Sequence, residues 1–88
     1  MFDLFKFRKQ HQAKFKQIKQ LESQIEQLST QKQALQLQLA DPAIYQDHQK
    51  ATLTQILEAQ KQINTAFQKS EDDWFELNEA LELLRQPT

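Results

Sequence analysis

The residues of this chain best suited to chemistry are the basic side chains near its N-terminus. Residues 1–20 hold six cations and a single carboxylate, Asp3, and Phe7 and Phe15 are interleaved among them. The cations are Lys6, Arg8, Lys9, Lys14, Lys16 and Lys19. Clustered lysine and arginine side chains bind the phosphates of nucleic acids. This stretch therefore predicts a surface that binds RNA or DNA.

The C-terminal end is acidic, which gives the same cations a second interpretation. Residues 70–88 hold six carboxylates against Arg85 alone. The acidic residues are Glu71, Asp72, Asp73, Glu76, Glu79 and Glu82. If the chain folds back on itself, the two ends lie side by side, neutralise each other and specify antiparallel pairing. An anionic membrane is a third possible ligand for a start rich in Phe and Lys, but the apolar spacing described below disfavours it.

The sequence offers no set of residues for catalysis, for a metal or for a cofactor. His11 and His48 stand at opposite ends of the first long apolar stripe, so they do not form a ligand pair. The chain has no cysteine and no glycine, which removes thiolate ligands and the usual phosphate-cradling loop. We interpret Glu71-Asp72-Asp73 as a solvated helix face. We therefore expect no catalytic residues, no metal, no cofactor and no enzyme activity.

Two long apolar stripes with steps of three and four residues must position the charged ends. The first stripe consists of Ile18, Leu21, Ile25, Leu28, Lys32, Leu35 and Leu39. The second consists of Leu53, Ile56, Gln60, Ile63, Phe67, Ser70, Trp74, Leu77, Leu81 and Leu84. This heptad spacing is typical of a coiled-coil seam. Upstream of Ile18 the apolar residue is Phe15 rather than Lys14, which indicates a phase slip, and the helix is least defined over residues 1–13.

A short break separates the two stripes. Pro42 disfavours helical backbone at Asp41, so the first helix should end near Ala40. Asp41 can cap a single turn that opens with Pro42, and Asp47 is a suitable N-cap for the second helix. We expect the apolar pair that follows Pro42 to fold back and close the end of the seam over Leu39 and Leu53. This pair is Ile44 and Tyr45.

These signals predict an all-α fold, an antiparallel two-helix coiled-coil hairpin that forms a single domain over residues 1–88. The first helix should span about 4–40, the turn 41–47 and the second helix about 48–85. Placing Leu39 opposite Leu53 sets the register of all other layers. The expected pairs are Leu35 with Leu57, Lys32 with Gln60, Leu28 with Ile63, Ile25 with Phe67, Leu21 with Ser70, Ile18 with Trp74, and Phe15 with Leu77.

Composition adds expectations about partners and location. A hairpin of two helices is too thin to enclose a large core, so a partner surface or a homodimer is expected. The absence of cysteine suits a reducing compartment. No apolar stretch approaches the length of a membrane span, and the charged start does not resemble a signal peptide. These features predict a cytoplasmic protein.

Four segments of the chain together resemble a known family. They are Ile18-x-x-Leu21-Glu22-x-x-Ile25-x-x-Leu28, Leu39-Ala40-Asp41-Pro42-x-Ile44-Tyr45, Lys50-x-x-Leu53 and Trp74-x-Glu76. Over roughly residues 15–84 the chain is similar to the C-terminal coiled-coil extension of ABC-F ATPases, soluble twin-cassette ATPases that act on the ribosome. The resemblance implies a hairpin that follows the second cassette and is associated with nucleic acid in one branch of the family and with ribosome function in others.

The resemblance also implies its partners: ribosomal RNA, transfer RNA or DNA, and the ATPase cassettes if the chain is part of a larger protein. The nucleotide-binding motifs of those cassettes are absent from this sequence, so ATPase activity is not carried over. The chain begins with its own Met1 and lacks the usual lead-in to the first helix. It is therefore interpreted as either an excised domain or a stand-alone relative.

Two alternatives remain open at the level of sequence. The turn and the later Glu79-Ala80-x-Glu82-Leu83-Leu84 also resemble the N-terminal helical domain of class I peptide-chain release factors, which leaves Trp74 unexplained. The other alternative is a structural coiled coil that self-associates into a four-helix bundle and buries Phe15, Trp74 and Phe75 between copies. None of these interpretations makes the chain an enzyme.

Overall fold

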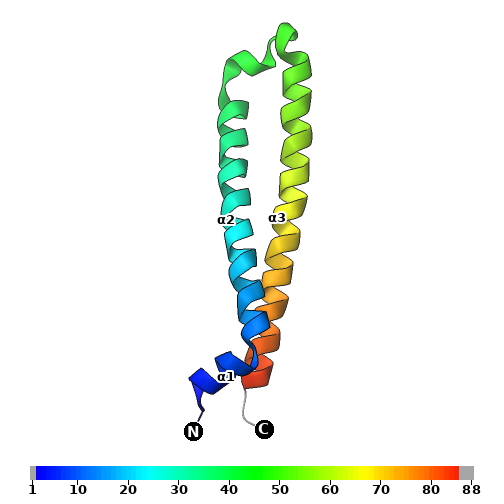
Figure 1. The fold of residues 1–88 in the computed structure, drawn as a ribbon. Helices are drawn as coiled ribbons and strands as arrows, with labels where there is room; N and C mark the ends of the chain where they lie inside the picture. Colours follow the sequence, from blue (N-terminus) through cyan, green and yellow to red (C-terminus); the bar gives the residue numbers. More distant parts are fainter. Residues whose placement is uncertain (1, 86–88) are drawn as a thin grey trace.

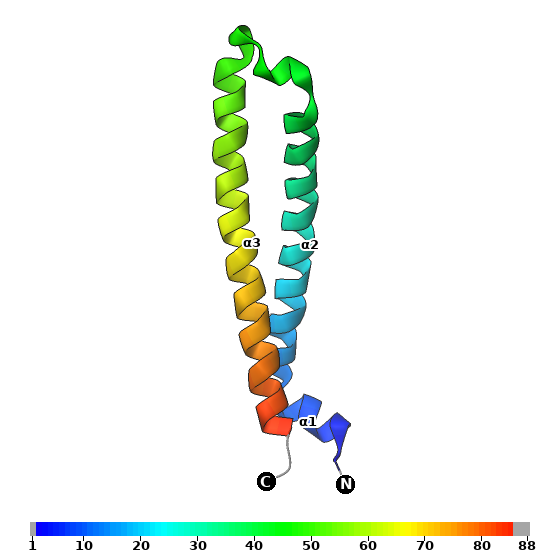
Figure 2. The same cartoon turned by 180° about the vertical axis from the view of Figure 1, so that it is seen from behind.

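The computed structural model describes residues 2–85, and within this range every regular element is helical. Residue 1 and residues 86–88 of the predicted domain lie outside it. The elements are α1 (Leu4–Gln10), α2 (Gln12–Ala40), the 3-10 segments η1 (Pro42–Tyr45) and η2 (Asp47–Gln49), and α3 (Lys50–Arg85). Helices α2 and α3 run antiparallel side by side in a rod of 66 × 18 × 17 Å (Figures 1 and 2). The all-α prediction is confirmed, with three α-helices rather than two.

The predicted apolar stripes are the faces that α2 and α3 turn toward each other. All seven stripe residues of α2, and those of α3 from Leu53 to Ser70, are buried or half-buried. Beyond Ser70 the buried face of α3 turns, so that Leu77, Ala80 and Leu81 are covered. Trp74 has 36% of its surface exposed and Leu84 is more exposed still.

The predicted register is wrong by one heptad. The Lys32 ammonium lies 5.3 Å from the centroid of the Phe67 ring, whereas Gln60 was its expected partner. Leu28 shares a surface groove with Ser70 rather than with Ile63.

Further along the rod, Leu21 lines a groove with Leu77, and Ile18 packs in a cluster with Leu81. Each of these partners lies one heptad beyond the expected residue. The cause is at the hairpin tip, where η1 and η2 both pack against α3. The first turns of α3 project past the end of α2 as a result (Figure 1).

The tip itself follows part of the predicted chemistry. The Asp41 Oδ1 atom accepts a hydrogen bond from the Ala43 backbone N–H at 3.0 Å, and Pro42 opens η1 as expected. Asp47 is not an N-cap, because Gln46 holds that position and Asp47 lies in the first turn of η2. Ile44 is half-buried, but the Tyr45 ring is exposed.

Tyr45 closes the end of α2 in another way than by burying its ring. Its hydroxyl donates a hydrogen bond of 2.6 Å to the backbone carbonyl of Leu39. This carbonyl belongs to the last turn of α2, where backbone acceptors lack partners within the helix. Tyr45 therefore stabilises the end of α2 through its hydroxyl group. The prediction that Ile44 and Tyr45 both pack over the end of the seam is wrong for the Tyr45 ring.

The predicted first helix is broken at His11, which has φ −116° and ψ 31°. The phase slip in the sequence marks this place. In the observed register Ile18 already lies beside Leu81, close to the end of α3 at Arg85. A straight helix would carry Phe7 past that end and into water. The bend instead folds Phe7 back onto Ile18 and Leu81, where only 8% of its surface is exposed.

Local interactions stabilise the short helix α1 on the far side of the bend. The Asp3 carboxylate caps it by accepting a hydrogen bond from the Lys6 backbone N–H at 3.2 Å. Arg8 and Lys9 occupy its last turn, where cations interact favourably with the helix dipole. Helix α1 projects sideways from the open end of the hairpin, where the start of α2 lies next to the end of α3 (Figures 1 and 2). None of the helices in residues 2–85 has both the length and the hydropathy needed to cross a lipid bilayer.

Candidate nucleic-acid interface

The bend at His11 creates a groove between α1 and the first turns of α2. The groove has a volume of about 770 Å³, within the range of sites that bind ligands of nucleotide size. Its lining residues are Phe5, Arg8, Lys9, Gln12, Phe15, Ile18, Lys19 and Glu22. We call this the elbow groove. It adjoins the predicted basic stretch and lies at the bend that interrupts the predicted continuous helix.

Three of the six predicted cations meet in the elbow groove. Arg8 and Lys9 enter it from α1, and Lys19 enters it from α2. On a continuous helix Lys9 and Lys19 would be separated by about 15 Å along the axis. The bend at His11 therefore converts a linear series of charges into a concave site.

The other three predicted cations are placed differently. Lys16 is exposed and shares a helix face with Gln12 and Lys19 through spacings of four and three residues, so it flanks the groove. Lys14 is half-buried and precedes Ile18 by one helical turn, which places it on the seam side of α2. Lys6 is exposed on α1 but does not line the groove.

The aromatic residues near the basic stretch are placed differently from the prediction. Phe7 is a core residue, packed against His11 with ring centroids 4.6 Å apart and against Phe15 at 6.0 Å. Phe15 is half-buried and holds the Arg8 guanidinium carbon 5.6 Å from its ring centroid. Phe5 is the exposed aromatic residue of the groove, and sequence reasoning missed it. Its spacing of three and four residues from Arg8 and Lys9 was the available signal.

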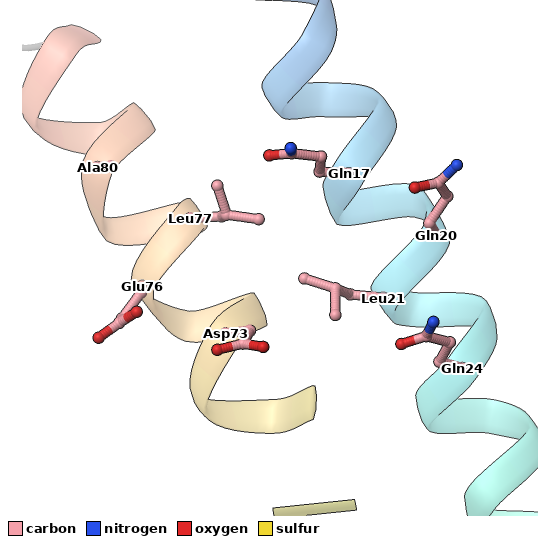
Figure 3. Close-up of a pocket in the computed structure, with 8 residues that line it drawn as sticks. All are labelled: Gln17, Gln20, Leu21, Gln24, Asp73, Glu76, Leu77 and Ala80. Atoms are coloured by element: carbon pink, nitrogen blue, oxygen red, sulfur yellow. The ribbon is translucent and has the colours of Figure 1, made fainter. Parts of the chain in front are cut away.

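Two of the six carboxylates of the C-terminal end line a different groove, which Figure 3 shows in close-up. There Asp73 and Glu76 of α3 lie across from glutamines of α2 rather than from lysines. These glutamines are Gln17, Gln20 and Gln24. With 3.6 residues per turn, the α2 residues of this groove and those of the elbow groove fall on opposite faces of the helix.

This separation bears on the two interpretations of the charged ends. Mutual neutralisation would place lysines of α2 beside the carboxylates of α3. Five of the residues concerned do not share a groove: Arg8, Lys9 and Lys19 line the elbow groove, and Asp73 and Glu76 line the other one. The Asp72 carboxylate accepts a hydrogen bond from Gln68 of its own helix at 3.0 Å. Three cations and one carboxylate, Glu22, line the elbow groove. The lining therefore carries a local excess of positive charge.

In the described part of the chain no three histidine, cysteine or acidic side chains gather in a way that could bind a metal ion. His11 packs its ring on Phe7 at the bend, which is a structural role. The side chains of Arg8, Lys9 and Lys19 give the elbow groove the charge that would suit an anionic group.

Comparison with known proteins agrees with the geometry of the hairpin. A family model described as the ABC transporter C-terminal domain matches residues 9–79, which include the tip and the Trp74-x-Glu76 segment. The comparison with curated proteins and that with solved structures gave no match. The match favours the resemblance to the extension of ABC-F ATPases over the release-factor alternative. The chain belongs to the family of ABC transporter C-terminal domains.

Proposed function

We propose that this chain is a non-catalytic module that binds nucleic acid through the elbow groove. The observation that carries the proposal is the meeting of Arg8, Lys9 and Lys19 around one groove, on the flank opposite Asp73 and Glu76. The resemblance to the ABC-F extension supports ribosomal RNA, transfer RNA or DNA as the ligand. In a longer protein of this kind the hairpin would deliver that contact for the ATPase cassettes, in the cytoplasm.

Local charge rather than net charge drives this binding. The formal net charge of the chain is −1, so the molecule as a whole does not attract phosphate. The rod is 17–18 Å across, whereas the Debye length is about 10 Å at 0.1 M salt. Carboxylates on the far flank are therefore largely screened from a phosphate in the elbow groove. Phosphate contacts position a nucleic acid without reading its bases, so we expect little sequence preference.

Fluorescence anisotropy at about 50 mM salt tests the proposal with a labelled RNA hairpin and a DNA duplex. With about four phosphates engaged, log affinity should fall with log salt at a slope near −3 to −4. The test variant combines Arg8→Gln, Lys9→Gln and Lys19→Gln. Its control combines Lys50→Gln, Lys61→Gln and Lys69→Gln, three exposed lysines of α3, and removes the same charge.

The groove variant should lose affinity by about tenfold or more, and the control by much less, because counterion release depends on phosphates held close to the cations. Both variants should remain folded in thermal melts, with a small loss of stability in the groove variant because Arg8 and Lys9 no longer interact with the α1 dipole. Equal losses in the two variants would contradict the proposal, since they would indicate diffuse attraction. A parent chain without any salt-sensitive binding would also contradict it.

Self-association is the second candidate function, and exposed apolar residues of α3 favour it. Phe75, Leu83 and Leu84 are exposed, and Trp74 is only partly covered. Exposed apolar side chains can mark an interface, and Phe75 and Leu83, eight residues apart, lie on neighbouring parts of the α3 surface. Analytical ultracentrifugation over a wide concentration range should then show a dimer that Phe75→Ala with Leu83→Ala dissociates. A monomer mass at every concentration would exclude this function.

A further inference from the structure

Phe5 is the least covered large apolar residue of the elbow groove, with 82% of its surface exposed. The other aromatic residues near the bend pack on one another: Phe2 lies 5.3 Å from Phe7, and Phe7 contacts His11 and Phe15. Phe5 stays outside this cluster, although full burial of a phenylalanine is worth about 1.5–3 kcal/mol. Because the exposed Phe5 ring lies next to cations, it is better placed to contact a ligand than to form part of the core.

The surroundings of Phe5 define what that ligand offers. Arg8 and Lys9 follow it by three and four residues on α1, so all three share a helix face. The Arg8 guanidinium is held in place on the Phe15 ring, 5.6 Å from its centroid. Lys19 adds a cation from the other wall of the groove. The exposed ring of Phe5 therefore lies in the same concave site as the Arg8 guanidinium and the lysine ammonium groups.

Single-stranded nucleic acid has the chemistry that matches this pairing. Proteins that bind single strands combine a positively charged groove for the backbone with aromatic side chains on which bases stack. A duplex cannot use the ring, because its bases already stack on each other. We infer that the ligand of the elbow groove is a nucleic-acid segment with an unpaired base, which stacks on Phe5 while Arg8, Lys9 and Lys19 hold the adjacent phosphates.

This inference rests on the proposed function and adds the class of nucleic acid to it. Glu22 lines the groove three residues beyond Lys19, where its carboxylate repels a further phosphate. The bound segment is therefore short. A loop or a bulge within a folded RNA presents such a segment, and so does a single strand.

The test compares one oligonucleotide as a single strand and as a duplex, by anisotropy at about 50 mM salt. Phe5→Leu keeps an apolar side chain but removes the ring, and Phe5→Trp keeps a ring. The control is Phe75→Leu, a phenylalanine that is 63% exposed on α3. Phe5→Leu should weaken single-strand binding by about fivefold or more and leave duplex binding nearly unchanged, because base stacking on an aromatic ring supplies this increment.

Further readouts separate stacking from other roles of Phe5. Phe5→Trp should restore single-strand affinity, Phe75→Leu should not alter it, and the salt slope of Phe5→Leu should equal that of the parent because every cation remains. Equal effects of Phe5→Leu on single strand and duplex, or no effect on either, would overturn the inference. So would a change of molecular mass in Phe5→Leu, which would show that a second copy covers the ring.

The failure of this inference can be told apart from the failure of the proposed function. If the Arg8, Lys9 and Lys19 variant loses binding while Phe5→Leu does not, the groove binds phosphate without stacking. If the parent binds neither the single strand nor the duplex, both proposals are wrong.

Discussion

Phe7 is the residue that organises the open end of the molecule. It closes the core cluster with Ile18 and Leu81, and its burial accompanies the bend at His11. The same bend brings Lys9 and Lys19 to one groove. A residue that does not touch the proposed ligand thus determines whether the site exists.

Phe7→Ala should lower the free energy of unfolding by about 3 kcal/mol, since it empties a buried position. Phe5→Ala, two residues away and exposed, should change it by less than about 0.5 kcal/mol. Urea denaturation followed by circular dichroism measures both variants. Equal effects of the two substitutions would show that Phe7 does not hold the cluster together.

Glu22 gives a second prediction at the scale of a single residue. It is the acidic member of the elbow groove lining, so Glu22→Gln should raise nucleic-acid affinity by about twofold to fivefold, as removal of a nearby like charge does. The matched control is Glu76→Gln, which makes the same change on the other flank. Anisotropy titrations that show equal gains for both variants would place the ligand outside the groove.

At the scale of elements, the hairpin register is the feature that the apolar pattern leaves undetermined. A shift of one heptad still sets stripe against stripe, because the repeat is the same before and after the shift. The tip breaks this degeneracy: η1 and η2 pack against α3, so the first turns of α3 extend past α2 (Figure 1).

Cysteine pairs can test this register in a chain that has no cysteine of its own. Leu28→Cys with Ser70→Cys should oxidise readily to a crosslinked monomer. Leu28→Cys with Ile63→Cys should not, because one heptad is a displacement of about 10.5 Å along the helix and disulfides join Cα atoms about 4.4–6.8 Å apart. Gel mobility with and without reductant distinguishes the two. Preferential oxidation of the second pair would restore the register predicted from sequence.

The local features of the hairpin could be predicted from the sequence. The stripe residues from Ile18 to Leu39 and from Leu53 to Ser70 were identified correctly, because helical periodicity is a local property of the chain. The Asp41 cap and the Pro42 turn were also local and were found. The shifted register and the bend at His11 depend on contacts between distant residues, so they could not be read from spacing alone.

The candidate site was likewise predictable only in those features that depend on neighbouring residues in the sequence. The basic residues were identified from local clustering, but only Arg8, Lys9 and Lys19 meet in one groove. The aromatic partner was assigned to Phe7 and Phe15, whereas the bend buries Phe7 and exposes Phe5. The phase slip before Ile18 indicated that the helix changes course there. The direction of the bend, however, depends on where α3 ends.

At the scale of the whole molecule, three of the N-terminal cations and two of the C-terminal carboxylates line separate grooves near the open end of the rod. The elbow groove is lined by Arg8, Lys9 and Lys19 together with one carboxylate, Glu22, and the other groove is lined by Asp73 and Glu76. A partner that is polyanionic should therefore approach from one side only. Approach from that side alone would distinguish a binding surface from charges that merely pair across a hairpin.

The direct test is a chemical-shift map of the isotopically labelled chain titrated with a short oligonucleotide near 50 mM salt. The backbone amides that shift should belong to residues lining the elbow groove, from Phe5 to Glu22, and the signals of Asp73 and Glu76 should stay in place. Raising the salt concentration should reverse the shifts, since phosphate contacts dominate. Shifts centred on Asp73 and Glu76, shifts spread evenly along α2 and α3, or none at all would contradict the account.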